Sequence, residues 1–301
     1  MINKITKILF FDWKWTTAST KAPFGNLLKN SHISWEVNDS EDNSVADPHL
    51  FKIKERNYLL VERISRIFNK GRIDLYMESS SKEKIFHYGD RLLDKKYHLS
   101  FPTLYEVSEN EYLLMCESIE TKTVKGWTLD KDLNILNETE IIRKPLIDPV
   151  LYKIDDIYFL FGSLRIKDQF YNFTIHKSKD LVSWEEMNSE NVSICQGSER
   201  NAGALISWEG KIYRPSQILE PKYGSGISIN EVVNISQDSY TEKKINEIVP
   251  ENIAGDKYNG LHTLSILDDT IYIDLRYSTI NLFAIVCKIL RKLRKGLYII
   301  N

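Results

Sequence analysis

The stretch Asp47-Pro48-His49-Leu50-Phe51, which leads through a polar turn to Tyr58-Leu59-Leu60-Val61-Glu62, decides the fold because its pattern recurs along the chain. Four later segments repeat an apolar run, a polar turn and a second apolar run that carries a tyrosine. The five tyrosines, which are Tyr58, Tyr112, Tyr158, Tyr213 and Tyr272, lie 54, 46, 55 and 59 residues apart. Repeats of about 50 residues are typical of propellers.

Each repeat predicts a β-hairpin, and most repeats are followed by a third strand such as Arg72–Tyr76. Small sheets repeated around an axis form a β-propeller. We therefore predict an all-β, five-bladed β-propeller over residues 1–279, with a strand within Lys7–Trp15 closing the ring. The alternative is a β-sandwich with chance similarity, but the tyrosines and turns recur together.

The last segment, residues 280–301, differs in composition and predicts a C-terminal amphipathic helix. Its apolar residues at helical spacing are Ile280, Phe283, Ala284, Ile289, Leu290 and Leu293, and its basic residues are Lys288, Arg291, Lys292, Arg294 and Lys295. Such a helix suits an anionic membrane surface, where each basic residue adds about 1 kcal/mol. The alternative is a helix that docks on the propeller and covers a blade edge.

Composition narrows the function classes. The chain has 40 basic and 42 acidic residues, so a net charge of −2 argues against nucleic acid as a partner. The cysteines, Cys116, Cys195 and Cys287, lie far apart without zinc-type spacing, so we expect no metal, no cofactor and a reducing compartment. The apolar run Ile8–Phe11 is too short for a signal peptide, and we expect a cytoplasmic protein.

Hairpin geometry predicts where the polar strand residues meet. Antiparallel pairing brings the start of each first strand beside the end of the second, and the innermost strands of a propeller all run the same way. Polar residues from all five blades should therefore ring one mouth of the channel. This set comprises Asp47, Glu62, Glu117, Asp148, Arg214, Gln217, His262, Asp274 and Arg276.

Four acids of this set, Asp47, Glu62, Glu117 and Asp148, are the candidate catalytic residues. Paired carboxyl groups at an aromatic-lined mouth suit sugar chemistry, in which one acts as base or nucleophile and another as acid. Like charges held close move their pKa values apart. The alternative is that Asp-Pro marks a turn and the glutamates are exposed strand ends.

The order of short motifs resembles a known family. The motifs are Ala46-Asp47-Pro48-His49, His98-Leu99-Ser100-Phe101-Pro102, Cys116-Glu117, Arg200-Asn201-Ala202-Gly203, Arg214-Pro215-Ser216-Gln217, Gly260-Leu261-His262-Thr263 and Asp274-Leu275-Arg276. They resemble the β-propeller domain at the N-terminus of plant glucosamine inositolphosphorylceramide transferases, and even more its free-standing bacterial relatives. The wider group resembles five-bladed arabinanase and invertase-type hydrolases.

The resemblance and the residue chemistry together give the substrate-binding candidates. These are His98, Ser100, Arg200, Asn201, Arg214, Gln217, His262, Thr263, Asp274 and Arg276. The arginines have planar forks that suit a phosphate, which points to a nucleotide-sugar or phosphorylated glycan as partner. The alternative is that they neutralise the acids as structural pairs.

Three functions follow as hypotheses. The first is a glycosyltransferase-like enzyme of cell-envelope glycan biosynthesis (lipopolysaccharide or capsule). It would take a sugar from an activated donor and pass it to a lipid-linked acceptor, and it would be peripheral on the inner face of the cytoplasmic membrane. The second is a glycoside hydrolase or phosphorylase of the five-bladed type, which rests on fold analogy. The third is a non-catalytic glycan-binding propeller.

Overall fold

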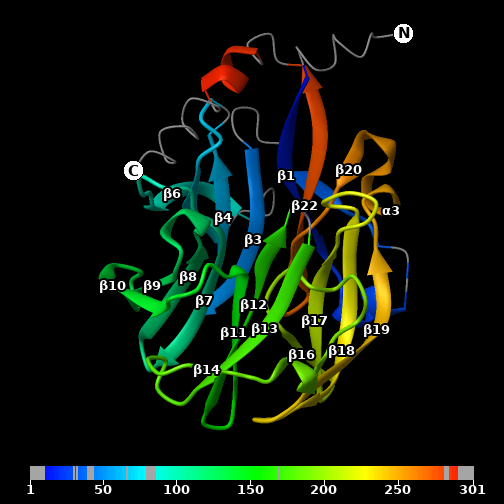
Figure 1. The fold of residues 1–301 in the computed structure, drawn as a ribbon. Helices are drawn as coiled ribbons and strands as arrows, with labels where there is room; N and C mark the ends of the chain where they lie inside the picture. The colour runs from blue at the N-terminus through cyan, green and yellow to red at the C-terminus, as the bar shows by residue number, and fades with distance from the viewer. Residues whose placement is uncertain are drawn as a thin grey trace.

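The computed structural model describes residues 11–280, apart from 30, 32, 39–43, 66, 79–85 and 168–169, and residues 285–290. The described strands form five small sheets arranged around a central channel, which confirms the five-bladed propeller (Figure 1). Within each blade the first strand lies innermost and the polypeptide runs outward by antiparallel hairpins.

Blades 1 to 3 are four-stranded and follow the chain in order. Blade 1 contains β3 (Ser44–Ile53), β4 (Arg56–Ile64), β5 (Gly71–Glu78) and β6 (Phe86–Leu93). Blade 2 contains β7 (Ser100–Ser108), β8 (Glu111–Glu117), β9 (Val124–Asp130) and β10 (Ile135–Ile142), with the turn η1 (Ile119–Thr121). Blade 3 contains β11 (Ile147–Ile154), β12 (Ile157–Lys167), β13 (Phe170–Ser178) and β14 (Glu185–Glu186), followed by η2 (Ser189–Asn191).

Blade 4 is built on β16 (Ile206–Trp208), β17 (Lys211–Ile218), β18 (Gly226–Ile235) and β19 (Tyr240–Ile248), with β15 (Val192–Ser193) parallel to β19. Blade 5 joins the two ends of the described chain. Its strands are β21 (Leu264–Leu267), β22 (Thr270–Ile280), β1 (Phe11–Lys21), β2 (Glu36–Asn38) and β20 (Tyr258–Gly260). The short helices α2 (Phe24–Leu28) and α3 (Glu251–Ala254) and the turn η3 (Gly255–Lys257) fill connections.

The ring closes because β1 pairs with β22 along their full length, from Phe11 opposite Ile280 to Lys21 opposite Thr270. This confirms a closing N-terminal strand, and the part of the predicted range before Phe11 lies outside the described residues. Without β1, the long edge of β22 that it pairs with would be exposed.

A bulge recurs at the start of three innermost strands. In β3 the pairing steps from Ala46–Glu62 to His49–Leu60. The two residues Asp47 and Pro48 therefore lie opposite a single residue of β4, so β3 contains one extra residue. β7 and β11 show the same step at Phe101-Pro102 and Asp148-Pro149. Each residue before the proline has a positive φ, 50° for Asp47 and 48° for both Phe101 and Asp148. Proline has no N–H to donate, so it fits where the ladder is interrupted, and the bulge redirects the preceding side chain.

The hydrophobic core lies between neighbouring blades. Between blades 1 and 2, Leu60, Ile73, Leu114 and Trp127 are nearly or fully buried in one cluster. Between blades 3 and 4, the rings of Phe161 and Tyr240 meet edge-on at 5.7 Å. Each such side chain contributes about 1.5–3 kcal/mol through burial. These wedges hold the inner strands rigidly around the channel.

The C-terminal segment contains a short helix at 285–290, in which Ile285, Val286 and Ile289 are exposed and Cys287 is buried. Ile280, predicted to start the helix, is instead the last residue of β22, because its pairing with Phe11 continues the strand. Phe283, Ala284, Leu293 and the basic residues from Arg291 to Lys295 lie outside the described residues. Among the described helices, none is long and apolar enough to cross a bilayer.

Candidate active site

A cavity of about 320 Å³ lies where the innermost strands begin. It is lined by side chains from blades 1, 2 and 3, from the closing strand β1 and from the loops before β16, β18 and β21. The lining residues are Asp12, Trp13, Trp15, Ser44, Ala46, Asp47, Glu62, Ile64, Asn69, His98, Ser100, Glu117, Asp148, Arg200, Tyr223 and His262. All four candidate catalytic acids and four of the candidate binding residues therefore meet at one mouth.

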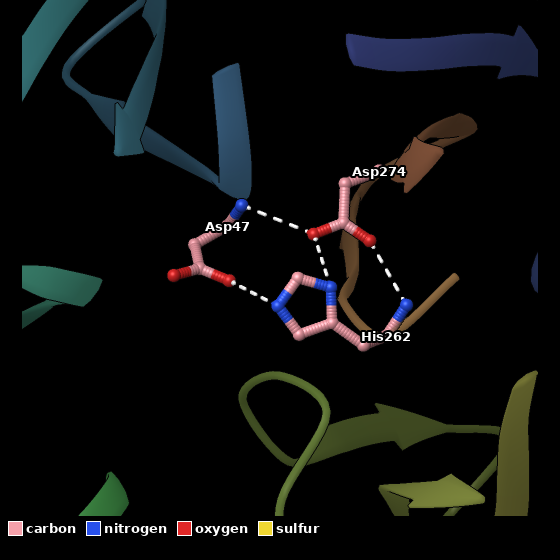
Figure 2. A group of neighbouring side chains, drawn as sticks. All are labelled: Asp47, His262 and Asp274. Carbon is pink, nitrogen blue, oxygen red and sulfur yellow. Dashed lines mark hydrogen bonds and ion pairs between the residues drawn. The ribbon is translucent and has the colours of Figure 1, made fainter. Parts of the chain in front are cut away.

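Asp47, His262 and Asp274 form a charged triad at the wall of this cavity (Figure 2). The imidazole of His262 lies between the two carboxyl groups, with Nε2 3.1 Å from Oδ1 of Asp47 and Nδ1 2.8 Å from Oδ2 of Asp274. Burial opposes a charged imidazole, but the two acids raise the pKa of His262 to about 10. His262 is therefore an imidazolium at neutral pH.

Asp47 is a buried carboxylate whose ionised form its neighbours stabilise. The hydroxyl of Thr263 donates to its Oδ1 over 2.9 Å, and the amide of Phe101 donates to its Oδ2 over 2.8 Å. Burial alone would raise the pKa of Asp47, but His262 and these two donors lower it to about 2. Asp47 is consequently ionised at any physiological pH, as a base, a nucleophile or a stabiliser of positive charge requires.

Asp274 supports the triad from behind and is fully buried. Its Oδ1 accepts the amides of His262 and Thr263 at 2.9 and 3.0 Å, and its Oδ2 accepts the amide of Asp47 at 3.2 Å. The ligand atoms of the triad lie within 4.8 Å of one another, close enough to hold a cation. Because both ring nitrogens of His262 face carboxyl oxygens, we interpret the group as an imidazolium held between two carboxylates.

Glu62 lies beside Asp47, and its pKa is shifted in the opposite direction. Burial raises the pKa of Glu62 to about 7, with the charge of Asp47 adding to the effect and His98 opposing it. Nε2 of His98 lies 3.0 Å from Oε1 of Glu62. Nδ1 of His98 lies 3.0 Å from the amide nitrogen of Gly71 and 3.4 Å from the carbonyl oxygen of Asn69. Burial opposes a charged ring, but Glu62 raises the pKa of His98 to about 9. A proton therefore lies between Nε2 of His98 and Oε1 of Glu62.

Glu117 and Asp148 form the second carboxyl pair. The amide of Asp148 donates to Oε2 of Glu117 over 2.9 Å. Burial, reinforced by the charge of Asp148, raises the pKa of Glu117 to about 8, against the opposing charge of Arg200. Glu117 is therefore protonated at neutral pH, which is the state that a general acid needs.

Asp148 itself is held by neighbours from blade 4 and the loop before it. Arg200 donates from Nε to Oδ2 over 2.7 Å and from the second terminal nitrogen to Oδ1 over 2.9 Å. Nε2 of Gln217 donates to Oδ2, and the side-chain amide of Asn201 donates to the backbone carbonyl of Asp148, both over 2.8 Å. The two donors of Arg200 that face Asp148 are thus engaged within the protein.

The aromatic wall of the cavity comes from the closing strand and blade 4. The ring of Trp15 lies 4.2 Å from that of His262, and the ring of Tyr223 lies 5.1 Å from it. Trp13 is 56% exposed at the rim. Aromatic faces beside hydrogen-bonding acids are the arrangement that binds the apolar and polar sides of a sugar ring.

The comparisons place the chain among known proteins. The profile of the family described as "Glucosamine inositolphosphorylceramide transferase 1, N-terminal" matches residues 13–270. The chain belongs to this family. Glucosamine inositolphosphorylceramide transferase 1 of Oryza sativa subsp. japonica is 27% identical over 232 residues, covering 73% of this chain and 30% of the relative. The Arabidopsis thaliana protein of that name is 27% identical over 239 residues, covering 73% and 31%. This chain thus spans about a third of their length.

A solved structure shares the fold at low identity. The exo-β-1,3-galactanase of Phanerochaete chrysosporium, determined with galactose, has a TM-score of 0.55 and 11% identity, covering 72% of this chain and 57% of that one. This similarity confirms the propeller architecture and says nothing further about this chain's chemistry. Both the predicted five-bladed propeller and the predicted resemblance to the N-terminal domain of the plant transferases are therefore confirmed.

Six of the candidate binding residues lie behind the cavity wall or beside it. They are Asn201, Arg214, Gln217, Thr263, Asp274 and Arg276. Arg214 has no exposed surface, and its guanidinium donates twice to Glu242 at 2.7 Å. The guanidinium of Arg276 lies over the rings of Trp13 and Trp15, at 5.0 and 5.4 Å. For Arg200 and Arg214 the structure shows the internal acid pairs that sequence reasoning gave as the alternative.

Sequence reasoning missed the tryptophans of the closing strand. Trp13 and Trp15 are two residues apart, and side chains at that spacing on a strand point to the same face. The alternation was visible, but nothing in the repeat showed which face of β1 borders the channel. Glu242, the partner of Arg214, was also missed, because it lies on β19, the fourth strand of its blade, where the repeat is weakest.

Proposed function

We propose that this protein is a glycosyltransferase-like enzyme that makes a glycosidic bond within the acid-lined cavity. One observation carries the proposal: a permanently ionised Asp47 shares the cavity with Glu62 and Glu117, whose raised pKa values keep protons available near neutral pH. Family membership supports transfer over other sugar chemistry, since the matching plant proteins are named as transferases.

The proposed roles follow from protonation. Asp47 removes the proton from the attacking hydroxyl or stabilises the positive charge that develops on the sugar ring. Glu117 donates its proton to the departing oxygen, and Asp148 keeps that proton in place by its charge. Glu62 and His98 orient a hydroxyl of the same sugar through the proton that they share. In the donor, the bond from the anomeric carbon to the leaving oxygen breaks, and the acceptor oxygen takes its place.

The donor we propose is a nucleotide-sugar or another phosphorylated sugar, and the acceptor is a glycan hydroxyl of the cell envelope carried on a lipid. Among the described residues, Arg200 is the one guanidinium that lines the cavity, and it is paired with Asp148. The sugar would therefore occupy the cavity while the phosphate extends to the rim. We place the reaction in the cytoplasm at the inner membrane face, in keeping with the three free cysteines.

Hydrolysis is the second candidate, because the same acids serve when water replaces the acceptor. The specific observation in its favour is that an ionised Asp47 shares the cavity with Glu62 and Glu117, whose pKa values are raised. Glycosidases use such a combination of a carboxylate and a carboxylic acid. A glycan-binding propeller without catalysis is the third candidate.

The deciding experiment incubates the purified chain with a panel of nucleotide-sugars, with and without glycan acceptors, and follows both the sugar and the nucleotide by chromatography. Transfer predicts a glycosylated acceptor, and hydrolysis predicts free sugar without acceptor. Asp47→Asn should reduce either turnover by about 100-fold or more while the circular dichroism spectrum stays unchanged. Unchanged turnover in this variant would exclude the proposed centre. If the wild type shows no turnover and Asp47→Asn binds the ligand within about tenfold of the wild-type affinity, the protein is a non-catalytic glycan-binding propeller.

A further inference from the structure

The cavity rim carries a ring of exposed apolar side chains that neither the fold nor the proposed chemistry requires. They lie on the connections between the second and third strands of blades 1 and 2, and at the adjoining ends of those two strands in blade 3. Their exposed fractions are 48% for Ile67, 50% for Phe68, 45% for Ile119, 70% for Ile166 and 72% for Phe170. Isolated exposed apolar residues are ordinary, but a set gathered on one face around a site marks an interaction surface.

Strand direction places these connections on the cavity side. The β4–β5 connection borders the cavity directly, since Ile64 and Asn69 line it. The β8–β9 connection follows Glu117 immediately, and Ile119 begins η1. The end of β12 continues four residues past Ser163, which pairs with Ile147 at the cavity, and so carries Ile166 outward beyond the mouth.

Basic side chains accompany the apolar ones. Lys122 follows Ile119, and Arg165 and Lys167 flank Ile166, all three exposed. The described acid among these residues, Glu120, is also exposed, and its carboxylate accepts the amide of His98 over 2.9 Å. Each of these two connections therefore presents an apolar side chain beside a positive charge.

The end of blade 5 extends the same face. Ile280 ends β22 at 65% exposure, and four residues separate it from the helix at 285–290. In Figure 1 this helix, in red, lies beyond the ends of β3 and β4. Its exposed Ile285, Val286 and Ile289 thus add to the apolar side chains on the side of the cavity.

We propose that this rim docks on an anionic lipid surface. We define the docking rim by Ile67, Phe68, Ile119, Ile166 and Phe170, with Lys122, Arg165 and Lys167. Apolar tips that enter the region between headgroups and acyl chains, beside basic residues that face acidic headgroups, are the two components of interfacial binding. The charge pattern selects this occupant over a purely apolar partner. Docking would turn the cavity toward the bilayer, so a substrate carried on a lipid could enter without leaving the membrane. The inference goes beyond the proposed reaction and does not depend on it.

The test is sedimentation of the full chain with phosphatidylcholine vesicles, with or without phosphatidylglycerol. Wild type should bind the vesicles that contain phosphatidylglycerol. The rim variant Ile67→Ser, Phe68→Ser, Phe170→Ser should bind about tenfold more weakly or worse, because three interfacial side chains are lost. The matched control is Met77→Ser, Leu136→Ser, Val182→Ser, which removes three exposed apolar residues near the opposite strand ends and should bind like wild type.

The charge component has its own variant. Lys122→Glu with Lys167→Glu should abolish the preference for phosphatidylglycerol. Both rim variants keep the basic C-terminal segment, so unchanged binding would assign any membrane affinity to that segment and overturn the proposal. Equal loss in the control triple, or no binding by wild type, would also overturn it. A change in mass by light scattering with unchanged vesicle binding would identify the rim as a contact between copies of the chain instead. None of these measurements requires turnover, so they remain separate from the test of the reaction.

Discussion

Asp148 acts on Glu117 in two ways at once: its backbone amide holds one carboxyl oxygen at 2.9 Å, and its carboxylate charge helps to keep the other oxygen's proton in place. The left-handed backbone at Asp148, with φ of 48°, allows both contacts from one residue. The bulge at the start of β11 therefore sets the acidity of a side chain in the neighbouring blade.

This relationship predicts a shift in the pH profile. In wild type, kcat/KM should fall as pH rises above about 8, because Glu117 then loses the proton that it donates. Asp148→Asn removes the charge that raises the pKa of Glu117 and leaves Arg200 without its counter-ion, and both changes lower that pKa. The alkaline limb of the residual activity should move toward lower pH. A limb that stays in place would show that another group supplies the proton.

A second prediction concerns the triad. His262→Asn leaves the carboxyl groups of Asp47 and Asp274 buried without their shared cation. Breaking a buried ion pair in this way costs about 3–5 kcal/mol, measured as the free energy of unfolding in urea. The double variant His262→Asn, Asp274→Asn removes one of the two stranded charges and should recover part of the loss. Equal stability of the single variant and wild type would refute the charged triad.

The pH dependence of stability follows from several buried groups. On the alkaline side, Glu117 and His262 keep protons in the folded state to pH of about 8 and 10, whereas they lose them near 4.5 and 6.5 when unfolded. The unfolded state therefore binds fewer protons, and stability should fall as pH rises above about 7. Urea midpoints at pH 6 and pH 9 check this, and a higher midpoint at pH 9 would contradict it.

On the acid side the signs reverse. Burial lowers the pKa of His49 and of His176 to about 4, so the unfolded chain takes up these protons below about pH 6.5 while the folded chain does not. Asp47 adds to this, since its pKa of about 2 must be passed before the folded state gains a proton. The two histidines should therefore make stability fall as the pH drops from about 6.5 to about 4, and Asp47 should extend the fall toward about pH 2. His176→Gln, which does not titrate, should make that decline shallower than in wild type.

Gly71 provides a steric test of the Glu62–His98 pair. A Cβ at this position would lie 2.2 Å from Oε1 of Glu62 and 2.2 Å from the carbonyl oxygen of Leu99. Gly71→Ala should therefore displace the glutamate and reduce turnover strongly. Gly162→Ala is the matched control, because it also lies in a second or third blade strand but meets only the side chain of Leu146, at 3.0 Å. Equal activities of the two variants would argue against a role for the pair.

The number of blades and the meeting of the acids could be predicted because both depend on local repetition. Hairpin pairing alone places Asp47 near Glu62, and the parallel course of the inner strands places Asp148 at the same mouth. The insertion of one residue at each Asp-Pro or Phe-Pro step could not be derived, since a register step depends on contacts with the neighbouring strand.

The sequence also could not show whether each arginine binds a ligand or pairs with an internal acid. A guanidinium that would bind phosphate and one that neutralises an internal acid have the same local signature. Arg214 is buried because Glu242 approaches from β19, and the two residues are 28 positions apart without a repeated motif between them. Long-range partners of this kind depend on how the blade packs, which a pattern of apolar runs does not specify.

The triad has a consequence for how the protein matures. His262 and Asp274 come from the last blade and Asp47 from the first, so the ion pairs that stabilise the buried Asp47 carboxylate form only after β22 has taken its place beside β1. A chain that holds only the first four blades would have Asp47, Glu62, Glu117 and Asp148 but would lack His262 and Asp274, the partners of Asp47. The complete site therefore depends on completion of the ring.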